Sequence, residues 1–454
     1  MRCLRESITH GAPALQAPVK DMREAQSLAA LLWAAWQLAR LLAVQLVEEV
    51  LAERAAHPTT WPNCRACGAR LESKGLASRQ LTTLLGVVKW ARRVGRCPHR
   101  CRIGQVVPLD EQLGLYPNQR TGRGLQRLAC GLALFVPFET VVLLLARLLG
   151  IEVSVGAVWQ WVQAAGAAGQ QRLAQRLAQV AAGERAVTES GDAATAALPL
   201  VIQADGVMVP FRPQGGQPQG RVSWREVKVG LVARLGQRLT RSGRQVTQVA
   251  RRRLVAVRGS VDQLAPRLWE AALREGVLAA GSVAWLSDGS RGLWRLYQEQ
   301  FGELAVGILD FYHAAQNLWQ GAKAWLDGRT TRARQWFARQ CRQLKAGQAD
   351  TVLRDLAAAL DLEGLPPAAR ERLHNVYTYL ETHRNHLDYA TYQANGLPIG
   401  SGMIESACKW LIQQRFKGVG MRWSEAGFDH LLHLRLAWVN DEFDALFACQ
   451  LSPT

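Results

Sequence analysis

The sequence predicts a multidomain α+β protein, and three features of the 454-residue chain lead to this prediction. Residues 25–55 and 311–392 form long, helix-favouring stretches rich in Leu and Ala. Short β-branched runs at 199–211 and 283–287 are typical of buried strands. Two cysteine pairs at 64–67 and 97–101 indicate a small module that has too few apolar residues to fold without a bound metal.

The composition indicates a folded chain with a polyanionic partner. Hydrophobic residues make up 48% of the chain, which argues against a disordered protein. The 55 Lys and Arg residues outnumber the 37 Asp and Glu residues and give a formal net charge of +18. A soluble protein this basic usually binds nucleic acid. The alternative is that a high genomic G+C content has raised the Arg and Ala fractions without a functional reason.

We expect a cytoplasmic protein that does not enter a membrane. Residues 1–21 contain scattered charges and no apolar core of a secretory signal. The apolar stretches 28–51 and 125–150 contain charged residues, which favours buried or amphipathic helices over membrane spans. Nine cysteines, four of them in ligand-like pairs, suit a reducing compartment and a metal site.

The order of these patterns predicts seven segments. We expect an N-terminal helical region (1–58), a cysteine-paired module (59–110), a helical region (111–182), a linker (183–198), an α/β core in two parts (199–310 and 397–454) and an all-helical insertion (311–396). In the core we expect strands near 199–204, 207–211, 225–235, 252–258, 283–287 and 304–309, with helices at 262–275 and 291–300. With the pieces in 199–211 counted together as the first strand, the order is βββαβαβ. A further strand is expected at 84–90.

The region 111–182 contains a candidate helix-turn-helix. A helix from Pro137 to Leu149 would end at Gly150, and Ser154 would cap the next helix. Helix, glycine-containing turn, capping serine and helix is the order of a DNA-binding helix-turn-helix. An ordinary helical hairpin explains the same residues equally well.

The paired cysteines predict one structural zinc ion. Cys64 and Cys67 form the first pair, and Cys97 and Cys101 form the second. Two such pairs on two loops can complete a tetrahedron of thiolates, which leaves no open position for water. His99 lies between the second pair and is a possible substitute for Cys101. Four free cysteines are the alternative.

Three carboxylates predict a catalytic site for two Mg²⁺ or Mn²⁺ ions. Asp205 and Asp288 each follow an apolar, β-branched run and precede a glycine, so we expect both at the ends of buried strands, where a carboxylate has no packing role. Glu405 lies at the start of a late helix. An aspartate on the first strand, one after the fourth and a glutamate on a late helix is the ribonuclease H-like catalytic order. Two turn aspartates and a surface glutamate are the alternative.

Asp310 and His313 lie together at the start of the helical insertion. They follow the strand 304–309 and would share a face of the first helical turn. Asp310 is a rival for the second metal ligand, but a structural hydrogen bond from His313 to Asp310 is the slightly favoured interpretation.

Basic residues in two regions predict contact with DNA. Those near the cysteine pairs would contact phosphate. Those after Glu405 alternate with aromatic side chains, which suits backbone contact and base stacking, although a solvated basic face is equally possible. The residues expected to bind DNA are Lys89, Arg92, Arg93, Arg96, Lys409, Arg415, Lys417, Arg422 and Trp423.

The chain resembles bacterial insertion-sequence DDE transposases with an N-terminal zinc ribbon and a Mutator-like catalytic core. The stretches that support the resemblance are 204–209 (ADGVMV), 224–230 (WREVKVG), 286–289 (LSDG), 308–313 (ILDFYH), 396–409 (GLPIGSGMIESACK) and 414–424 (QRFKGVGMRWS). The last two are the specific ones. The resemblance covers about 60–440 and implies a ribonuclease H-like core with an all-helical insertion, with Asp205, Asp288 and Glu405 as the metal triad. Asp310 and His313 match the Asp-x-x-His motif of such enzymes.

The sequence therefore predicts a transposase that binds the terminal inverted repeats of an insertion sequence. It would cleave a phosphodiester at each end, and the exposed 3′-OH would attack target DNA. A homodimer or larger assembly is expected because two ends must be held together. Two alternatives remain. One is a catalytically silent zinc-ribbon DNA-binding regulator derived from a transposase, and the other is a ribonuclease H-like nuclease without strand transfer.

Overall fold

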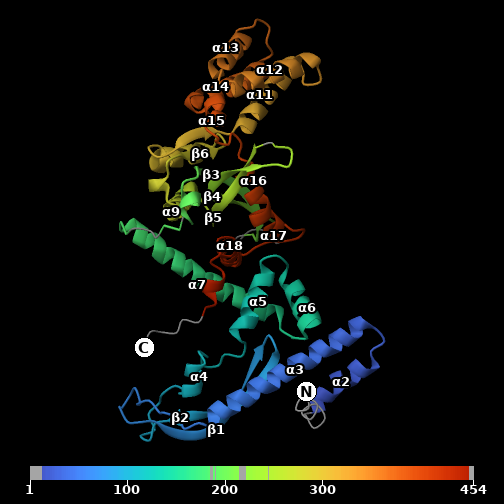
Figure 1. The fold of residues 1–454 in the computed structure, drawn as a ribbon. Helices are drawn as coiled ribbons and strands as arrows, with labels where there is room; N and C mark the ends of the chain where they lie inside the picture. Colours follow the sequence, from blue (N-terminus) through green and yellow to red (C-terminus); the bar gives the residue numbers. More distant parts are fainter. Residues whose placement is uncertain (1–12, 185–187, 190, 214–220, 244, 449–454) are drawn as a thin grey trace. The chain divides into compact units, whose positions relative to one another are not determined.

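The computed structural model describes residues 13–184, 188–189, 191–213, 221–243 and 245–448 (Figure 1). These residues form two compact units. Among the described residues, the first contains 13–162 and 444–448, and the second lies within Gln163–Phe443. The mixture of helices, one hairpin and one mixed sheet confirms the predicted multidomain α+β class.

The first unit is a set of helices with a two-stranded antiparallel hairpin. Its elements are α2 (Pro13–Glu24), α3 (Leu28–Ala56), β1 (Glu72–Thr83), β2 (Gly86–Arg96), α4 (Pro108–Gln112), α5 (Arg123–Ala133), α6 (Phe138–Leu149), the beginning of α7 (Val155–Ala181) and η5 (Asp444–Leu446). The predicted strand 84–90 is displaced, because Leu84 and Leu85 form the turn that joins β1 to β2.

The predicted helix at 25–55 is confirmed as α3. The side chain of Ser27 accepts a hydrogen bond from the N–H of Ala30 and caps the helix. The buried Arg40 donates to the carbonyl of Leu85, and Glu48 accepts from the N–H of Lys89 at 2.7 Å. The charges within this apolar helix therefore fasten it to the hairpin.

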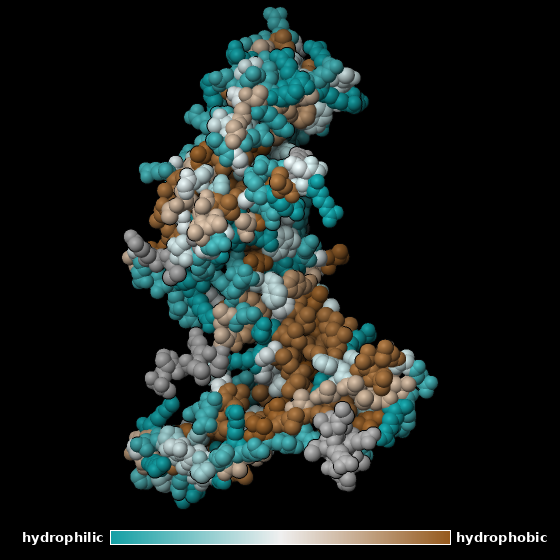
Figure 2. All heavy atoms as spheres, in the orientation of Figure 1, coloured by the Kyte–Doolittle hydropathy of each residue, from teal (hydrophilic) through white to brown (hydrophobic). Residues whose placement is uncertain are grey.

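The rest of α3 is unusually apolar on its surface. Leu28, Leu32, Trp33 and Trp36 are all exposed, and apolar side chains gather on the visible face of the first unit (Figure 2). Among the described residues, α3 is the one helix long and apolar enough to cross a membrane by length and composition. Mostly buried core helices of soluble proteins and signal sequences also meet this criterion, but only 17% of the apolar window of α3 is buried.

The predicted helix ends around Gly150 are confirmed. Gly150 follows α6 with φ +62°, a left-handed conformation that glycine adopts without a steric penalty. The hydroxyl of Ser154 accepts from the N–H of Ala157 at 3.1 Å and caps α7. Both interpretations of this segment, helix-turn-helix and helical hairpin, contain these same ends, so the helix-turn-helix stays a prediction.

The second unit is built on a five-stranded mixed sheet. Its first half contains α8 (Ala193–Ala196), β3 (Leu200–Phe211), β4 (Ser223–Leu239), β5 (Gln245–Arg258), α9 (Val261–Arg274), η1 (Val277–Ala279), β6 (Val283–Ser287), α10 (Arg291–Leu296), η2 (Tyr297–Phe301) and β7 (Val306–Leu309). The strands lie in the order β5-β4-β3-β6-β7. β4 is antiparallel to β3 and β5, whereas β6 and β7 are parallel to β3. The order of elements along the chain is the predicted βββαβαβ.

One prediction about the core is wrong in detail. The strands expected at 199–204 and 207–211 are a single strand, β3, and Asp205 lies in its middle rather than at its end. The reason is that β4 pairs with β3 along its whole length, from Leu200 to Phe211, whereas β6 pairs only as far as Gln203. Asp288 does directly follow its strand, β6.

Helices complete the second unit. They are α11 (Phe311–Leu326), α12 (Thr331–Lys345), α13 (Ala349–Leu360), α14 (Pro367–Thr382), η3 (Arg384–His386), α15 (Tyr389–Ala394), α16 (Gly402–Ala407), η4 (Cys408–Gln413), α17 (Gln414–Phe416) and α18 (Glu425–Val439). Helices α11–α14 group together away from the sheet (Figure 1), as expected for a helical insertion. α9 packs on β4 and β5, while α16 and η4 pack on β3.

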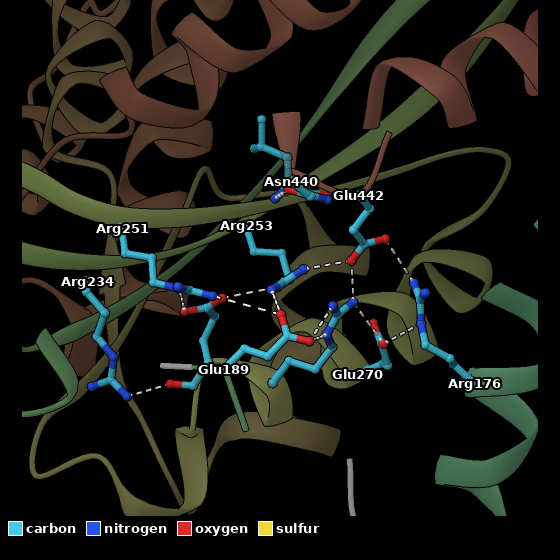
Figure 3. Close-up of polar contacts among 11 residues, drawn as sticks. Arg176, Glu189, Arg234, Arg251, Arg253, Glu270, Asn440 and Glu442 are labelled. Carbon is cyan, nitrogen blue, oxygen red and sulfur yellow. Dashed lines mark hydrogen bonds and ion pairs between the residues drawn. The ribbon is translucent and has the colours of Figure 1, made fainter. Parts of the chain in front are cut away.

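A buried ion-pair network joins four segments of the second unit (Figure 3). Arg253 on β5 lies at its centre and binds Glu275, Glu189 and Glu442 at 3.0, 2.7 and 3.1 Å. Arg274 on α9 binds the same Glu189 and Glu442 at 2.7 and 2.6 Å. Glu189 belongs to the predicted linker 183–198, of which residues 185–187 and 190 lie outside the described residues. This network therefore fastens part of that segment to the core.

Candidate metal centre

β3 and β6 bring Asp205 and Asp288 together. Asp205 is paired with Val229 on β4, and its carboxylate accepts from the N–H of Gly206 at 2.6 Å. The carboxylate of Asp288 accepts from the N–H of Ser290 at 3.0 Å. Burial raises the pKa of Asp205, and the negative charges of Asp288 and Glu405 raise it further. We refer to Asp205, Asp288 and Glu405 as the carboxylate cluster. Among the described residues, however, Glu405 has Asp310 and His313 as its partners within metal-ligand distance, and neither Asp205 nor Asp288 belongs to that group. The shared metal site of the three carboxylates therefore stays a prediction.

Glu405 reaches this position through the glycine-rich segment 396–404. The side chain of Gln203, fully buried on β3, accepts from the N–H of Ile404 at 3.0 Å and donates to the carbonyl of Gly400. The hydroxyl of Ser401 then donates to the carboxylate of Glu405 at 2.9 Å. Gln203 precedes Asp205 by two residues, so one face of β3 both offers a carboxylate and docks the segment that holds another.

Gly400 is required by a close approach in that segment. A Cβ atom there would lie 2.6 Å from Cε2 of Tyr312 at the start of α11. The N–H of Phe311 also donates to the carbonyl of Ile399 at 2.8 Å. The glycine-rich sequence therefore allows the backbone to pack against the first turn of the insertion.

Asp310 is the N-cap of α11 and is fully buried. Its carboxylate accepts from the N–H of His313 at 2.7 Å and from the N–H of Ser401. Burial alone would raise the pKa of Asp310, but the hydrogen bonds from His313 and Ser401 outweigh burial and lower it. Because both oxygens already accept protein hydrogen bonds, this geometry favours a structural role for Asp310.

His313 nevertheless lies at the edge of the carboxylate cluster. Its Nδ1 is 3.2 Å from Oδ1 of Asp310, and ligand atoms of Asp310, His313 and Glu405 all lie within 4.8 Å of one another. The adjacent carboxylate of Asp310 raises the pKa of His313 most, and the charges of Asp288 and Glu405 act in the same direction. Direct ligation of a metal by Asp310 or His313 remains a prediction.

The helical insertion contributes a residue that sequence reasoning missed. The ring of Tyr379 on α14 lies against Gly289, where a Cβ atom would be 2.1 Å from Cε2 of the ring. The Tyr379 hydroxyl is buried and has no hydrogen-bond partner of ordinary geometry among the residues that the structure describes. Burial and the charges of Asp288 and Asp310 raise its pKa, so the hydroxyl stays protonated. The glycine after Asp288 was the available signal, but it also fits a simple turn.

The carboxylate cluster fits divalent metal ions. Oxygen ligands from Asp and Glu are the ones that Mg²⁺ and Mn²⁺ prefer. Burial is the main cause of the raised pKa of Asp205, and repulsion by Asp288 and Glu405 adds to it; a bound cation would relieve that repulsion.

The four predicted zinc ligands converge in the first unit. The Sγ atoms of Cys64, Cys67, Cys97 and Cys101 all lie within 4.8 Å of one another, and those of Cys67 and Cys97 are 3.5 Å apart. His99 is exposed and lies outside this cluster, so Cys101 completes it.

Backbone turns hold the cysteine pairs in place. The N–H of Gly68 donates to the carbonyl of Cys64, and the N–H of Arg100 donates to the carbonyl of Cys97. Burial alone would raise the pKa of Cys97, but hydrogen bonds from the neighbouring N–H groups and thiols lower it to about 6. A cluster of four thiols with one easily ionised member fits a structural zinc ion.

Two residues expected to bind DNA instead make contacts within the protein. Arg92 is buried, donates to the carboxylate of Asp110 at 3.2 Å and also donates to the carbonyls of Ala77 and Ser78. Arg415 is also buried, and its guanidinium lies over the ring of Trp423. These two arginines stabilise the fold, and we therefore remove them from the proposed DNA surface.

The remaining basic candidates are accessible to different degrees. Lys89, Lys409, Lys417 and Arg422 are exposed, Arg93 is half-buried, and Arg96 forms a surface ion pair with Glu72 at 3.5 Å. The indole N–H of Trp423 donates to the carbonyl of Phe416, which fixes the ring against the protein.

Comparisons with known proteins include a distant likeness to a solved structure. No protein-family model matches the chain, and no curated protein is similar to it. A solved structure described as a Drosophila P element transposase strand transfer complex is similar with a TM-score of 0.34 and 10% sequence identity, over 75% of this chain and 96% of that chain. A likeness this distant does not assign a function.

Proposed function

We propose that this protein catalyses metal-dependent phosphodiester cleavage in DNA, with Asp205, Asp288 and Glu405 as the metal-binding carboxylates. The observation that supports this most is the register of β3 and β6, which pairs Gln203 with Leu286 and so brings Asp205 and Asp288 to the same end of the segment over which the two strands pair. Gln203 also accepts a hydrogen bond from the N–H of Ile404, next to Glu405. The charges of Asp288 and Glu405 both raise the pKa of Asp205. Three carboxylates held this way have no packing role.

The residues divide into ligands and supports. Asp205 and Asp288 are rigidly placed by β3 and β6 and would share the ions, and Glu405 would complete the coordination of one ion. Ser401 orients Glu405, and Asp310 holds the backbone of Ser401. When bound, two divalent ions supply the activation of the attacking oxygen and the stabilisation of the leaving oxygen.

The finer proposal is a DDE transposase that acts on the terminal inverted repeats of an insertion sequence. It is supported by the resemblance of the segments 396–409 and 414–424 to such enzymes, and by the formal net charge of +18. Lys409 is exposed one helical turn after Glu405, where a cation would meet a phosphate of bound DNA. Cleavage would expose a 3′-OH for attack on target DNA within a dimer or larger assembly.

The test uses duplex DNA copied from the sequences that flank the gene, with Mg²⁺ and the full-length protein. We expect the wild-type protein to cleave at the ends of the inverted repeats. Asp205→Asn should lower the single-turnover rate by about a thousandfold or more, because metal coordination supplies several kcal/mol of transition-state stabilisation. DNA binding should change little.

Glu226→Gln is the matched control. Glu226 lies against Gly206 but forms an ion pair with Lys228 at 2.7 Å and is not a proposed ligand. The control should cleave like the wild-type protein. Cleavage by Asp205→Asn at the wild-type rate would overturn the assignment. A pre-cleaved end with a free 3′-OH that is never joined to target DNA would reduce the proposal to a nuclease.

A further inference from the structure

The β4–β5 region of the second unit contains a long stretch without acidic residues. From Val227 to Val261 the sequence has no Asp or Glu, whereas nine positions are Lys or Arg. The two strands extend well beyond the part of the sheet that β3 covers, because Arg234 is the last β4 residue paired with β3.

At the base of this region, acids from elsewhere in the chain neutralise the arginines. Arg251 and Arg253 bind Glu275 from the end of α9, and Arg253 also reaches Glu189 and Glu442 (Figure 3). Arg258 binds Asp429 at 2.7 Å. The guanidinium of Arg234 donates to the backbone carbonyl of Leu198 at 2.7 Å. The fold therefore satisfies each of these buried or half-buried cations.

Beyond the base, the two strands form a ribbon that we define as residues 235–243 and 245–249. A β-bulge marks its start, because Arg234 pairs with Arg251 whereas Leu235 pairs with Val249. Such a bulge bends a strand and redirects the residues beyond it. Leu239 is 67% exposed in the ribbon, and Gln237, Arg238 and Arg241 are exposed as well.

The cations of the ribbon are not neutralised. Within the described part of the chain, neither Arg238 nor Arg241 has an ion-pair partner. Exposed amides from Gln237, Gln245 and Gln248 accompany them. Arg252, on the other face of β5 from Arg251 and Arg253, lies over the ring of Trp410, next to the exposed Lys409. Arginines before the bulge are therefore neutralised, whereas Arg238 and Arg241 beyond it are not.

The ribbon lies within reach of DNA bound at the carboxylate cluster. Asp205 pairs with Val229, and Leu235 is six residues further along β4, about 20 Å at about 3.3 Å per residue. Leu239, the last residue of β4, is about another 13 Å away by the same rule, and Arg241 lies in the turn beyond it. Since a base pair rises about 3.4 Å, the ribbon would meet a duplex about 6 to 10 base pairs from the scissile phosphate. Gln237 also lies 3.8 Å from the position a Cβ of Gly396 would take, at the start of the segment that leads to Glu405.

We propose that the β4–β5 ribbon is a duplex-DNA-binding arm of this protein, in which Arg238 and Arg241 contact backbone phosphates on DNA that extends away from the carboxylate cluster. A two-stranded ribbon fits the width of the DNA major groove. Charge complementarity identifies the partner, since the ribbon offers cations and amides without any acid. This inference rests on the proposed function for the position of the DNA, but the contact itself is measured without cleavage.

The test measures binding of the full-length protein to a fluorescent duplex of about 40 base pairs and arbitrary sequence over a series of salt concentrations. The double variant Arg238→Ala/Arg241→Ala should bind roughly tenfold more weakly near physiological salt, and the slope of log K against log salt should become shallower by about two. The matched control is Arg332→Ala/Arg334→Ala, which removes two exposed arginines from α12. Its slope should equal that of the wild-type protein.

Identical slopes for the ribbon variant and the wild-type protein would overturn the inference, as would an equal loss in both double variants. A second experiment measures Mg²⁺-dependent cleavage of two end DNAs, one too short to reach the ribbon and one long enough to extend past it. The ribbon variant should lose activity only on the longer DNA at limiting protein concentration. If the ribbon variant changes the salt slope but the wild-type protein cleaves no DNA, the ribbon binds DNA and the proposed cleavage function is wrong. If the wild-type protein cleaves DNA and the ribbon variant has the wild-type salt slope, the cleavage function is supported and the proposal that the ribbon binds DNA is wrong.

Discussion

The cysteine cluster of the first unit and the carboxylate cluster of the second are both candidate metal sites, but they are built in opposite ways. Cys64 and Cys97 are themselves the buried centre of a small cluster with Leu71, and partly buried neighbours such as Trp61 complete it. The carboxylates instead lie beside strands with a complete core, in which Leu200, Val201 and Ile202 are fully buried. We infer that a metal ion would stabilise the fold at the first site and only supply chemistry at the second.

Loss of zinc should therefore have the largest effect on stability. Cys97→Ser removes the thiol whose pKa is lowered to about 6, and with it one of four ligands. Structural zinc sites contribute about 10 kcal/mol or more to folding, so the hairpin β1–β2 should lose its protection from hydrogen exchange. The purified wild-type protein should contain one zinc ion per chain, and the variant should contain none.

Cys341→Ser is the control for this prediction, because Cys341 lies on α12, away from the cluster. Zinc content and exchange should match the wild-type values. Normal hydrogen-exchange protection of β1 and β2 in the Cys97→Ser variant would contradict a folding role for zinc, since the hairpin would then fold without the ion.

The scaffold of the second site should depend on the buried ion pairs. Arg253→Met removes one of the two arginines that pair with the buried Glu275, leaves only Arg251, and should destabilise the second unit by about 3–5 kcal/mol. Hydrogen exchange in β4, β5 and α9 reports this unit alone. Arg176→Met is the control, because Arg176 is 36% exposed at the edge of the network and should cost less than about 1 kcal/mol. Equal effects of both changes would show that the network does not support the sheet.

Acid should weaken the same unit through His433 on α18. Burial lowers the pKa of His433 to about 4, below its value in the unfolded chain. The unfolded state therefore gains a proton as pH falls below about 6.5, while the folded state stays neutral until about pH 4. Stability is lost across that window, by about 2 kcal/mol between pH 7 and pH 5.

His433→Gln removes this contribution. Urea unfolding at the two pH values should show that the variant loses about 2 kcal/mol less than the wild-type protein. Other histidines with lowered pKa values, such as His383 and His386, remain in both proteins and cancel in the comparison. An identical pH dependence would contradict the assignment.

The smallest effect is expected beside the carboxylates. Tyr379→Phe removes a buried hydroxyl without a hydrogen-bond partner among the described residues and keeps the ring that packs on Gly289. Because an unpaired buried polar group is unfavourable, the second unit should become more stable by about 1 kcal/mol. A clear loss of stability would show that the hydroxyl has a partner in the folded protein.

The sequence pattern was sufficient to predict most helices and strands, but not which contacts individual side chains make. Periodicity predicted α3 and the βββαβαβ order, and Gly150 and Ser154 marked helix ends, because these signals are local. The central position of Asp205 in β3 could not be predicted, since it depends on how far β4 pairs. The roles of Gln203 and Tyr379 depend on contacts with residues about 200 and 90 positions away, and single-sequence patterns do not contain such contacts.

Two of the nine predicted DNA-binding residues are set aside for a similar reason. Arg92 and Arg415 belong to basic runs that resemble a phosphate-binding surface, but each is buried. Asp110, which neutralises Arg92, lies 18 positions away. The free cations of the β4–β5 ribbon were missed because only the fold separates Arg238 from neutralised neighbours such as Arg253.

The proposed chemistry requires that Asp205, Asp288 and Glu405 hold divalent ions in common. The most direct measurement is Mn²⁺ binding to the full-length protein by electron paramagnetic resonance, with Asp205→Asn, Asp288→Asn and the control Glu226→Gln. We expect saturable binding that weakens by about tenfold or more in each Asp variant and is unchanged in the control. Equal Mn²⁺ affinity in the wild-type protein and both Asp variants would contradict the central claim.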